Sequence, residues 1–455
     1  MKKLILTAAL AFITTFAMQA QNVLTLDECI NIALENNIDI KRSRNNAISA
    51  RAGYFQSKFN FLPSLSAGAN HQWQEGLIFD QTAGGLLNTT TLQGGGSISA
   101  NITLFNGFSN TYGAQRDKAL LQASEQDVEG SIQATEASIV LSFLQVVSTR
   151  ENLKIQEQTL ELLEEQLKRE EKREAAGVGN MEQVYNFRSQ VAAQQLQIVN
   201  QRNLLETNKL TLIQLLLLNP ADNYEFAGIT ANDAELEAEV EDYNNVYQKS
   251  VDYSPAIKSA EFNLEASEKS LKIARFAWMP SLTLGASIGT GWSSNVPARD
   301  PETLAILEPR RVEDLSVQFE NNVSKNATFR LNIPLFSRFQ NRTAVQQNKI
   351  QMLNSELNLE QARNTLTNQV QQAYLNLVNA KTSYAAAKES LLNLNTAFEF
   401  AKNRYESGTI DFVTYLQSLN GKNNGELELV RSKYGILFRK YILDIFTGES
   451  KLNNN

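Results

Sequence analysis

The sequence predicts an α+β membrane protein built as an internal tandem duplication. Four β-strands per chain would contribute to a shared transmembrane β-barrel, and long α-helical hairpins would form coiled coils. Three observations predict this class. A Pro-Ser-Leu stretch occurs twice, within Phe61–Ala69 and Trp278–Ala286. Four segments alternate small polar with apolar residues, the period of a strand, and two long proline-free segments carry apolar heptads.

The two copies align along most of the chain. Pro63 falls on Pro280 at an offset of 217, whereas Gly177 falls on Gly408 at an offset of 231. The second copy therefore carries 14 additional residues (231 minus 217), which lie between Ala286 and Asn332. Because this interval is rich in proline and charge, we expect the insertion to form an exposed loop.

Residues 1–20 have the pattern of a secretory signal peptide. Lys2 and Lys3 precede an apolar run from Leu4 to Ala17, and small or polar residues follow up to Ala20. A transmembrane anchor is the competing interpretation, but the run is shorter than the roughly 20 residues that cross a bilayer. We therefore expect an exported protein whose mature chain begins at Gln21.

The composition argues against catalysis, cofactors and nucleic acid. Cys29 is the only cysteine and His71 the only histidine, so neither a disulfide framework nor a metal cluster of these residues is expected. The charges within Glu164–Arg173 alternate in sign like a solvated coiled-coil face, and no motif assembles a nucleophile with a base. A net charge of -7 disfavours nucleic acid, whose phosphates attract basic surfaces. We expect a non-enzyme without cofactor or metal.

The alternating segments are expected to be strands at about 64–74, 96–105, 281–292 and 327–336. A half-buried soluble sheet would show the same alternation. A membrane barrel is favoured for two reasons. The polar face consists of the small residues Ser, Thr, Gly and Asn, and a tryptophan lies on the apolar face at the far end of the first and third strands. The candidate membrane-interface aromatics are Phe61 and Trp278 on the inner side and Trp73 and Trp292 on the outer side.

Helices are expected to fill most of the remaining chain. The first begins at Thr25, where Glu28 completes the spacing of a capping box, and continues to about residue 60. Two long helices, each followed by a glycine turn and a return helix, are expected at about 108–174 with 181–218 and about 338–405 with 412–446. At 1.5 Å per residue each long helix would span roughly 100 Å, which requires a coiled-coil partner.

Apolar residues recur every seven positions in both long helices. The first series is Ile132, Ile139, Val146, Leu153, Leu160 and Leu167. The second is Val370, Leu377, Tyr384, Leu391, Phe398 and Tyr405, with the companion series Leu366, Ala373, Ala380, Ala387, Leu394 and Ala401. Series spaced by three and four residues form a coiled-coil seam, and alanine permits close approach.

The chain is therefore divided into a signal peptide at 1–20, a first repeat at 21–220, an acidic irregular linker at 221–250, a second repeat at 251–448 and a tail at 449–455. Four strands cannot close a membrane barrel, because hydrocarbon does not tolerate open strand edges. Several protomers must share one barrel. Two, three or four protomers would give 8, 12 or 16 strands, and the strand count does not choose among them.

Four motifs then invite a family comparison. They are Leu26-x-x-x-Ile30-x-x-Ala33-x-x-x-Asn37, the repeated Pro-Ser-Leu strand openings, Ile333-Pro-Leu-Phe336 and Tyr405-Glu-Ser-Gly408. In this order, the motifs resemble those of the TolC family of outer-membrane efflux channels over essentially the whole mature chain. The resemblance implies a homotrimer with a 12-stranded barrel in the outer membrane of a Gram-negative bacterium. It further implies a helical periplasmic tunnel, a periplasmic adaptor, and an inner-membrane pump driven by protons or ATP.

The resemblance also places candidate sites on the hairpin tips at 175–182 and 406–413. Adaptor docking is expected at Gly177, Val178, Gly408 and Thr409. Where well-studied members have entrance aspartates, this chain has Thr414 and Gln417, and the equivalent first-copy residues are Gln183 and Asn186. The nearby acids are Glu182 and Asp411, so any acidic constriction is displaced or weaker. A solvated helix face is the alternative interpretation of these two acids.

Two functions remain in view. The first is a passive conduit that carries drugs, small molecules or secreted polypeptides from an adaptor and pump to the outside. The second is a structural coiled coil anchored at the cell surface, without a conducting path. Contact with outer-membrane lipid is expected in both, and the sequence does not identify a substrate.

Overall fold

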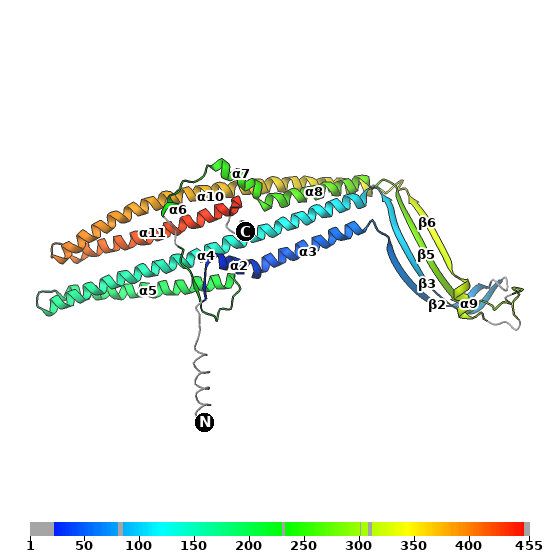
Figure 1. The fold of residues 1–455 in the computed structure, drawn as a ribbon, viewed down its shortest axis with the longest axis horizontal. Coiled ribbons are helices and arrows are strands. Elements are labelled where there is room, and N and C mark those ends of the chain that lie inside the picture. Colours follow the sequence, from blue (N-terminus) through cyan, green and yellow to red (C-terminus); the bar gives the residue numbers. More distant parts are fainter. Residues whose placement is uncertain (1–21, 81–84, 230–232, 301, 308–311, 450–455) are drawn as a thin grey trace, which may run out of the picture. The chain divides into compact units, whose positions relative to one another are not determined.

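The structure is a computed structural model that describes residues 22–80, 85–229, 233–300, 302–307 and 312–449 (Figure 1). The predicted signal peptide at 1–20, and the predicted tail beyond residue 449, lie outside the described residues. The chain forms two compact units. The helical unit comprises Met1–Asn45, Glu125–Lys258 and Glu360–Asn455, and the sheet unit comprises Asn46–Ser124 and Ser259–Leu359.

Helix α2 (Leu26–Asn36) begins as the sequence predicts. Thr25 accepts a hydrogen bond from the Glu28 amide, and the Glu28 carboxylate accepts one from the Thr25 amide, so the capping box is confirmed. The prediction of a single helix to residue 60 is wrong, because the chain breaks at Asn37 and resumes as α3 (Ile38–Phe59). The Asn37 side chain accepts hydrogen bonds from the next amides, as an N-cap does.

Two helical hairpins carry most of the helical unit. The first consists of α4 (Ser109–Ala175) and α5 (Met181–Leu215), and the second of α10 (Gln340–Glu406) and α11 (Phe412–Thr447). Each long helix has 67 residues. Most of the second predicted heptad series is buried, as are its companion alanines: Val370, Leu377, Tyr384, Phe398, Tyr405, Ala373, Ala380, Ala387 and Ala401. The coiled-coil seam is therefore real.

The main core joins α2, α4, α5 and α11. Its buried side chains include Cys29, Phe143, Leu212 and Tyr434. Phe226 completes it from β4 (Tyr224–Phe226), which pairs in parallel with β1 (Asn22–Leu24). One 18-residue window of α4 is apolar enough to cross a membrane on composition, but half of that window is buried in the structure. Helix α4 is therefore better explained by this core than by a membrane.

The segment 221–250 is more ordered than predicted. It contains β4, α6 (Asp233–Glu237) and the start of α7 (Tyr243–Tyr253), which precedes α8 (Pro255–Phe276). Asp242 caps α7 by accepting a hydrogen bond from the Asn244 amide. The prediction of an irregular linker is wrong here, because β4 and α6 have only three and five residues and leave no readable periodicity, and α7 begins inside the predicted linker and ends beyond it.

The sheet unit holds an antiparallel sheet in the order β2-β3-β5-β6 (Figure 1). Its strands are β2 (Ser64–Asp80), β3 (Gly85–Asn106), β5 (Ser281–Ser293) and β6 (Ser324–Asn332). The first two strands extend beyond the predicted 64–74 and 96–105. The fourth ends four residues before the predicted 336, because Pro334 has no amide to donate to the ladder.

The additional residues of the second copy lie between β5 and β6, as expected. Part of that interval forms α9 (Leu315–Asn321), a short helix capped by Asp314. Helix α9 packs on the end of β5, where the Gln318 side chain accepts a hydrogen bond from the Ser293 amide. Residues 301 and 308–311 of the interval, which include Pro301 and Pro309, lie outside the described residues.

Candidate functional site: sheet faces and hairpin tips

The sheet has one polar and one apolar face. Cross-strand rows alternate between them: the row Ser66–Ser99–Ser287–Asn326 is polar, and the row Ala67–Ile98–Ile288–Lys325 is apolar apart from its last member. Side chains on successive rows point to opposite faces. The exposed apolar side chains include Leu65, Phe329 and Leu331. A sheet of this kind is suited to hydrocarbon on one side and water on the other.

The outer aromatics predicted from sequence lie on the apolar face. His71 and Trp292 occupy one row with Gly94 between them, and their rings stack with centroids 5.5 Å apart. Gly94 makes this possible, because a Cβ at this position would lie 2.9 Å from the Trp292 indole nitrogen. Trp73, on the neighbouring apolar row, is 62% exposed.

Phe61 and Trp278 precede the two strand openings and are also exposed. An aromatic group that sequence reasoning missed lies beside them. The ring of Tyr112 stacks on that of Phe276 at 5.7 Å, and Phe108 meets Phe276 edge-on at 6.2 Å. These rings fix the start of α4 against the end of α8, where helix gives way to strand.

The two hairpin tips have the same backbone geometry. Gly177 and Gly408 have φ angles of 74° and 75°, in the left-handed region that glycine adopts without strain. The next amide in each tip donates to a carbonyl five residues back: Val178 to Arg173 at 3.0 Å and Thr409 to Arg404 at 2.9 Å. This is the hydrogen-bond pattern of a helix ending in a Schellman motif. Val178 and Thr409 are exposed beyond these turns.

The candidate constriction residues lie just after the tips. Asp411 caps α11 by accepting hydrogen bonds from Thr414, and these bonds hold the pKa of the Asp411 carboxyl below its usual value. Glu182, Thr414 and Gln417 are exposed, and Gln183 is half-buried. The Asp411 carboxylate is therefore partly committed to the helix cap, although it stays charged and accessible.

An aromatic cluster, which we call the tip cluster, lies behind the tips. Its buried members come from α4, α5, α10 and α11: Leu163, Phe187, Phe398, Tyr405, Tyr415 and Leu419. Tyr405 and Tyr415 stack with ring centroids 4.9 Å apart, and Phe187 reaches them from the other hairpin. Burial raises the pKa of Tyr415 to about 12, with Glu406 adding to the shift. The heptad pattern identified Phe398 and Tyr405, but not their partners from α5 and α11.

Ion pairs join the helices around this cluster. Arg169 of α4 contacts Glu406 of α10 at 2.6 Å, and Arg188 of α5 contacts Glu171 of α4 at 2.8 Å. Glu170 is only 1% exposed and pairs with Arg173 at 3.2 Å. The alternating charges predicted to be a solvated face are therefore partly used in holding the helix ends together.

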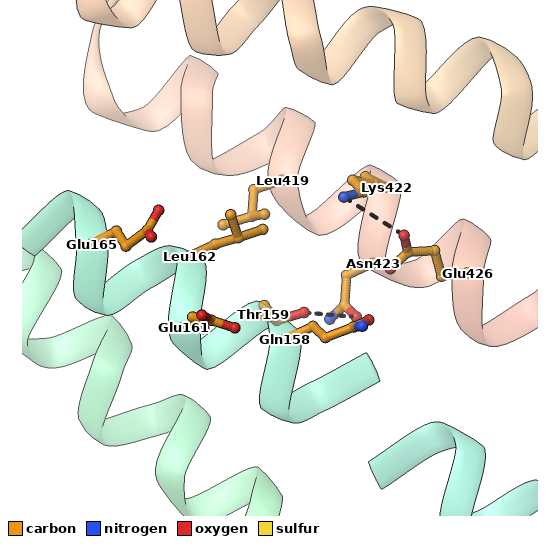
Figure 2. A pocket seen from close by; sticks show the side chains of 9 residues that line it. All are labelled: Gln158, Thr159, Glu161, Leu162, Glu165, Leu419, Lys422, Asn423 and Glu426. Carbon is orange, nitrogen blue, oxygen red and sulfur yellow. Dashed lines mark hydrogen bonds and ion pairs between the residues drawn. The ribbon is translucent and has the colours of Figure 1, made fainter. Parts of the chain in front are cut away.

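A polar hollow of about 380 Å³ lies between α4 and α11, above the tip cluster (Figure 2). Thr159 donates to the Asn423 side chain across it at 3.3 Å, and Lys422 pairs with Glu426 at 3.6 Å. Glu161 and Glu165 add two further carboxylates to its wall. Among the described residues, no group of three or more His, Cys, Asp or Glu is placed to hold a metal ion.

Comparison with known proteins identifies this architecture. The family model described as "Outer membrane efflux protein" matches twice, over residues 29–216 and 246–435, which is well over half of the chain. This chain belongs to the outer membrane efflux protein family. The two matches correspond to the two copies of the duplication, and the resemblance to TolC channels is confirmed.

Solved structures share the fold of this family member. CusC, described as forming a transmembrane channel, superposes with a TM-score of 0.77 at 19% identity, covering 93% of this chain and 91% of that chain. The outer membrane protein VceC of Vibrio cholerae gives 0.72 at 16% identity, with 93% and 96% covered. The predicted fold class, with strands for a barrel and hairpins for a helical tunnel, is thus confirmed.

Relatives known by sequence carry export names. Toxin and drug export protein A of Aggregatibacter actinomycetemcomitans is 20% identical over 90% of this chain and 83% of its own length. The pyoverdine export outer membrane protein OpmQ of Pseudomonas putida is 26% identical over 59% of this chain and 57% of its own. The efflux protein is therefore an outer-membrane channel of a tripartite export system, with its helical part in the periplasm. The alternative of a structural coiled coil without a conducting path is set aside.

Proposed function

We propose that three copies of this chain form one 12-stranded barrel that continues into a periplasmic tunnel. The observation that supports this proposal is that the sheet has two open edges. Among the described strands, β2 pairs only with β3 and β6 only with β5, so the outer backbone N–H and C=O groups of β2 and β6 have no strand partner. Hydrocarbon does not tolerate such edges, and pairing β6 of one protomer with β2 of the next removes them. The apolar face then meets lipid, with Trp73 and Trp292 at the outer interface and Phe61 and Trp278 at the inner one.

The second part of the proposal is adaptor docking at the hairpin tips. Gly177, Val178, Gly408 and Thr409 form two equivalent exposed turns, and two equivalent turns per chain suit a partner that repeats around a ring. The polar hollow between α4 and α11 extends this surface along the hairpins (Figure 2). A periplasmic adaptor is a suitable occupant if it presents amide, lysine or arginine donors there, because such donors would pair with the Glu161 and Glu165 carboxylates.

Crosslinking tests the docking proposal. A photo-activated amino acid at Val178 or Thr409, in cells that contain the whole export system, is expected to capture the adaptor. The same amino acid at Leu141, an exposed position of α4 distant in sequence from the tips, serves as the control. Equal capture at Leu141 and the tips, or repeated failure at both tips, would contradict docking there.

We further propose that the tips surround the entrance and that Glu182 and Asp411 supply its negative charge. Gln183, Thr414 and Gln417 line the entrance without charge in this proposal, so the constriction is less acidic than one built on aspartates. The exposure of Glu182 and Asp411 supports a site that cations can reach. Block by hexaamminecobalt added from the periplasmic side is expected to weaken when both acids are changed to amides.

The cargo is proposed from the relatives. Export of toxins, drugs and the siderophore pyoverdine is named for relatives, which suggests organic solutes or polypeptides delivered by a proton-driven or ATP-driven pump. Purified protein is expected to form large conductances in planar bilayers. Correctly folded protein that leaves the bilayer silent would refute the conduit.

A further inference from the structure

Very few charges lie on the part of the sheet where β5 pairs with β6. This part comprises residues 64–68, 97–106, 281–289 and 324–332, bounded by the rows that pair Ser281 with Asn332 and Gly289 with Ser324. Strand β2 takes part in it only as far as the row of Ser64, Asn101 and Gly285. It contains two charged residues, Lys325 and Arg330, both in β6. Aspartate and glutamate do not occur in it. The balance of charge on the whole protein, which is acidic, is therefore reversed here.

The two cations lie on opposite faces. Lys325 occupies the row of Ala67, Ile98 and Ile288, on the apolar face. Arg330 lies opposite Thr283, which lies opposite Thr103, so it belongs to the polar face. Arg330 lies five positions after Lys325 in β6, and side chains an odd number of positions apart in a strand point to opposite faces.

The polar face is the hollowed one. A depression of about 250 Å³ is lined by Ser99, Asn101, Thr283, Ser287, Thr328 and Arg330. The Asn101 side chain lies over Gly285, where a Cβ would come within 3.0 Å of its oxygen. A sheet that is concave on its polar side closes into a barrel with that side around the water-filled lumen. Arg330 is thus the single lumen-facing charge of the part of the sheet where β5 pairs with β6, and it lies two residues from the end of β6 that leads to the helices.

We propose that Arg330 makes the inner end of the barrel lumen an anion-selective ring. This inference rests on the trimeric channel proposed above, which places three copies of Arg330 at one level. Twelve strands about 4.8 Å apart and tilted by about 40° give a barrel radius of roughly 12 Å. An extended arginine reaches about 6 Å from its Cα, so the three guanidinium groups lie about 6 Å from the axis and about 10 Å from one another.

These distances are no greater than the Debye length, which is about 10 Å at 0.1 M salt. An ion crossing this level therefore experiences all three charges together. Each guanidinium carries a full positive charge, and no carboxylate in the part of the sheet where β5 pairs with β6 offsets it. Anions, and cargo bearing phosphate, sulfate or carboxylate groups, gain from the ring, while cations are repelled. The row of Thr283 and Thr103 adds hydroxyl donors beside each guanidinium.

The test measures the zero-current potential of full-length protein in planar bilayers under a KCl gradient near 0.1 M. Arg330→Gln is expected to lower the ratio of chloride to potassium permeability at least about threefold, given screened Coulomb attraction at these distances. Arg330→Lys is expected to retain most of the ratio. Lys325→Gln is the matched control, because it removes the same charge from the same strand on the opposite face, and it should leave the ratio unchanged.

A second readout uses inorganic tripolyphosphate added to the outer side. It is expected to reduce the current of the unmodified protein and of Arg330→Lys, but not that of Arg330→Gln. An unchanged permeability ratio with unchanged block in Arg330→Gln would overturn the ring. So would an equal effect of Lys325→Gln. The conductance itself reports on the channel proposal: if current flows and selectivity does not respond to Arg330, the conduit stands and only this inference falls.

Discussion

The tip cluster offers the sharpest test of how the two hairpins hold together. Phe187 is fully buried, and its ring centroid lies 4.7 Å from that of Phe412 and 6.1 Å from that of Tyr405. Truncating a buried phenylalanine to alanine costs about 3–5 kcal/mol. Each factor of ten corresponds to about 1.4 kcal/mol, so Phe187→Ala should raise the population of locally opened tips at least about 100-fold.

Hydrogen exchange measured by mass spectrometry on the detergent-solubilised protein reports this population. Peptides covering 183–191 and 410–419 should exchange faster, while peptides of the main core near Phe143 should not change. Tyr185→Ala is the matched control, because Tyr185 lies on the same helix and is 60% exposed. If exchange at the tips changed less than about threefold, or equally in both variants, the tip cluster would not be what joins the hairpins.

Three further predictions concern single residues. Gly95→Ala would place a Cβ 2.7 Å from the Thr290 carbonyl oxygen of β5, so the band of the folded barrel should be absent from a heat-modifiability gel. In Gly68→Ala the added Cβ meets no atom within 4 Å, so this control variant should fold normally. Burial raises the pKa of the Cys29 thiol to about 12. The native protein should therefore react with iodoacetamide at pH 8 about a thousandfold more slowly than the unfolded chain, because only the thiolate reacts. Comparable rates would contradict the burial. Hydrogen bonds lower the pKa of Asp411 in the folded protein, so its cap is complete above the unfolded pKa and is lost as the pH falls through the folded pKa. Amide exchange at Thr414, corrected for the intrinsic rate, should therefore accelerate on acidification, and Asp411→Asn should remove that dependence.

Much of the fold is readable from sequence because duplication supplies an internal control. The proline at each strand opening, the glycine at each tip and the spacing of the heptads all occur twice, so each local signal confirms the other. The capping box at Thr25 was readable because it depends on two side chains three residues apart. These features are governed by local chemistry, which sequence records directly.

Other features depend on neighbours that no local pattern reveals. The break at Asn37 was missed because its side chain ends one helix and starts the next without proline or glycine. The outer half of β3 was missed because its Gly- and Thr-rich run shows no alternation, although β2 pairs with all of it. Phe187 and Tyr415 join the tip cluster through contacts between the two hairpins, so the periodicity within either helix does not predict that they meet.

Beyond the row of Gln93 and Ser293, β2 and β3 continue as a two-stranded ribbon, whereas the second copy has α9 and its insertion at this end. In the proposed trimer, three ribbons would alternate with three insertions around the outer mouth. Antibodies, bacteriophages and competing bacteria would meet these segments first. Because β5 forms no ladder with the ribbon beyond this row, the ribbon can change in sequence and length without disturbing the register of the wall below. In the proposed trimer, the segments at the cell surface can therefore vary while the six similar strand pairs in the membrane, two from each protomer, keep their arrangement.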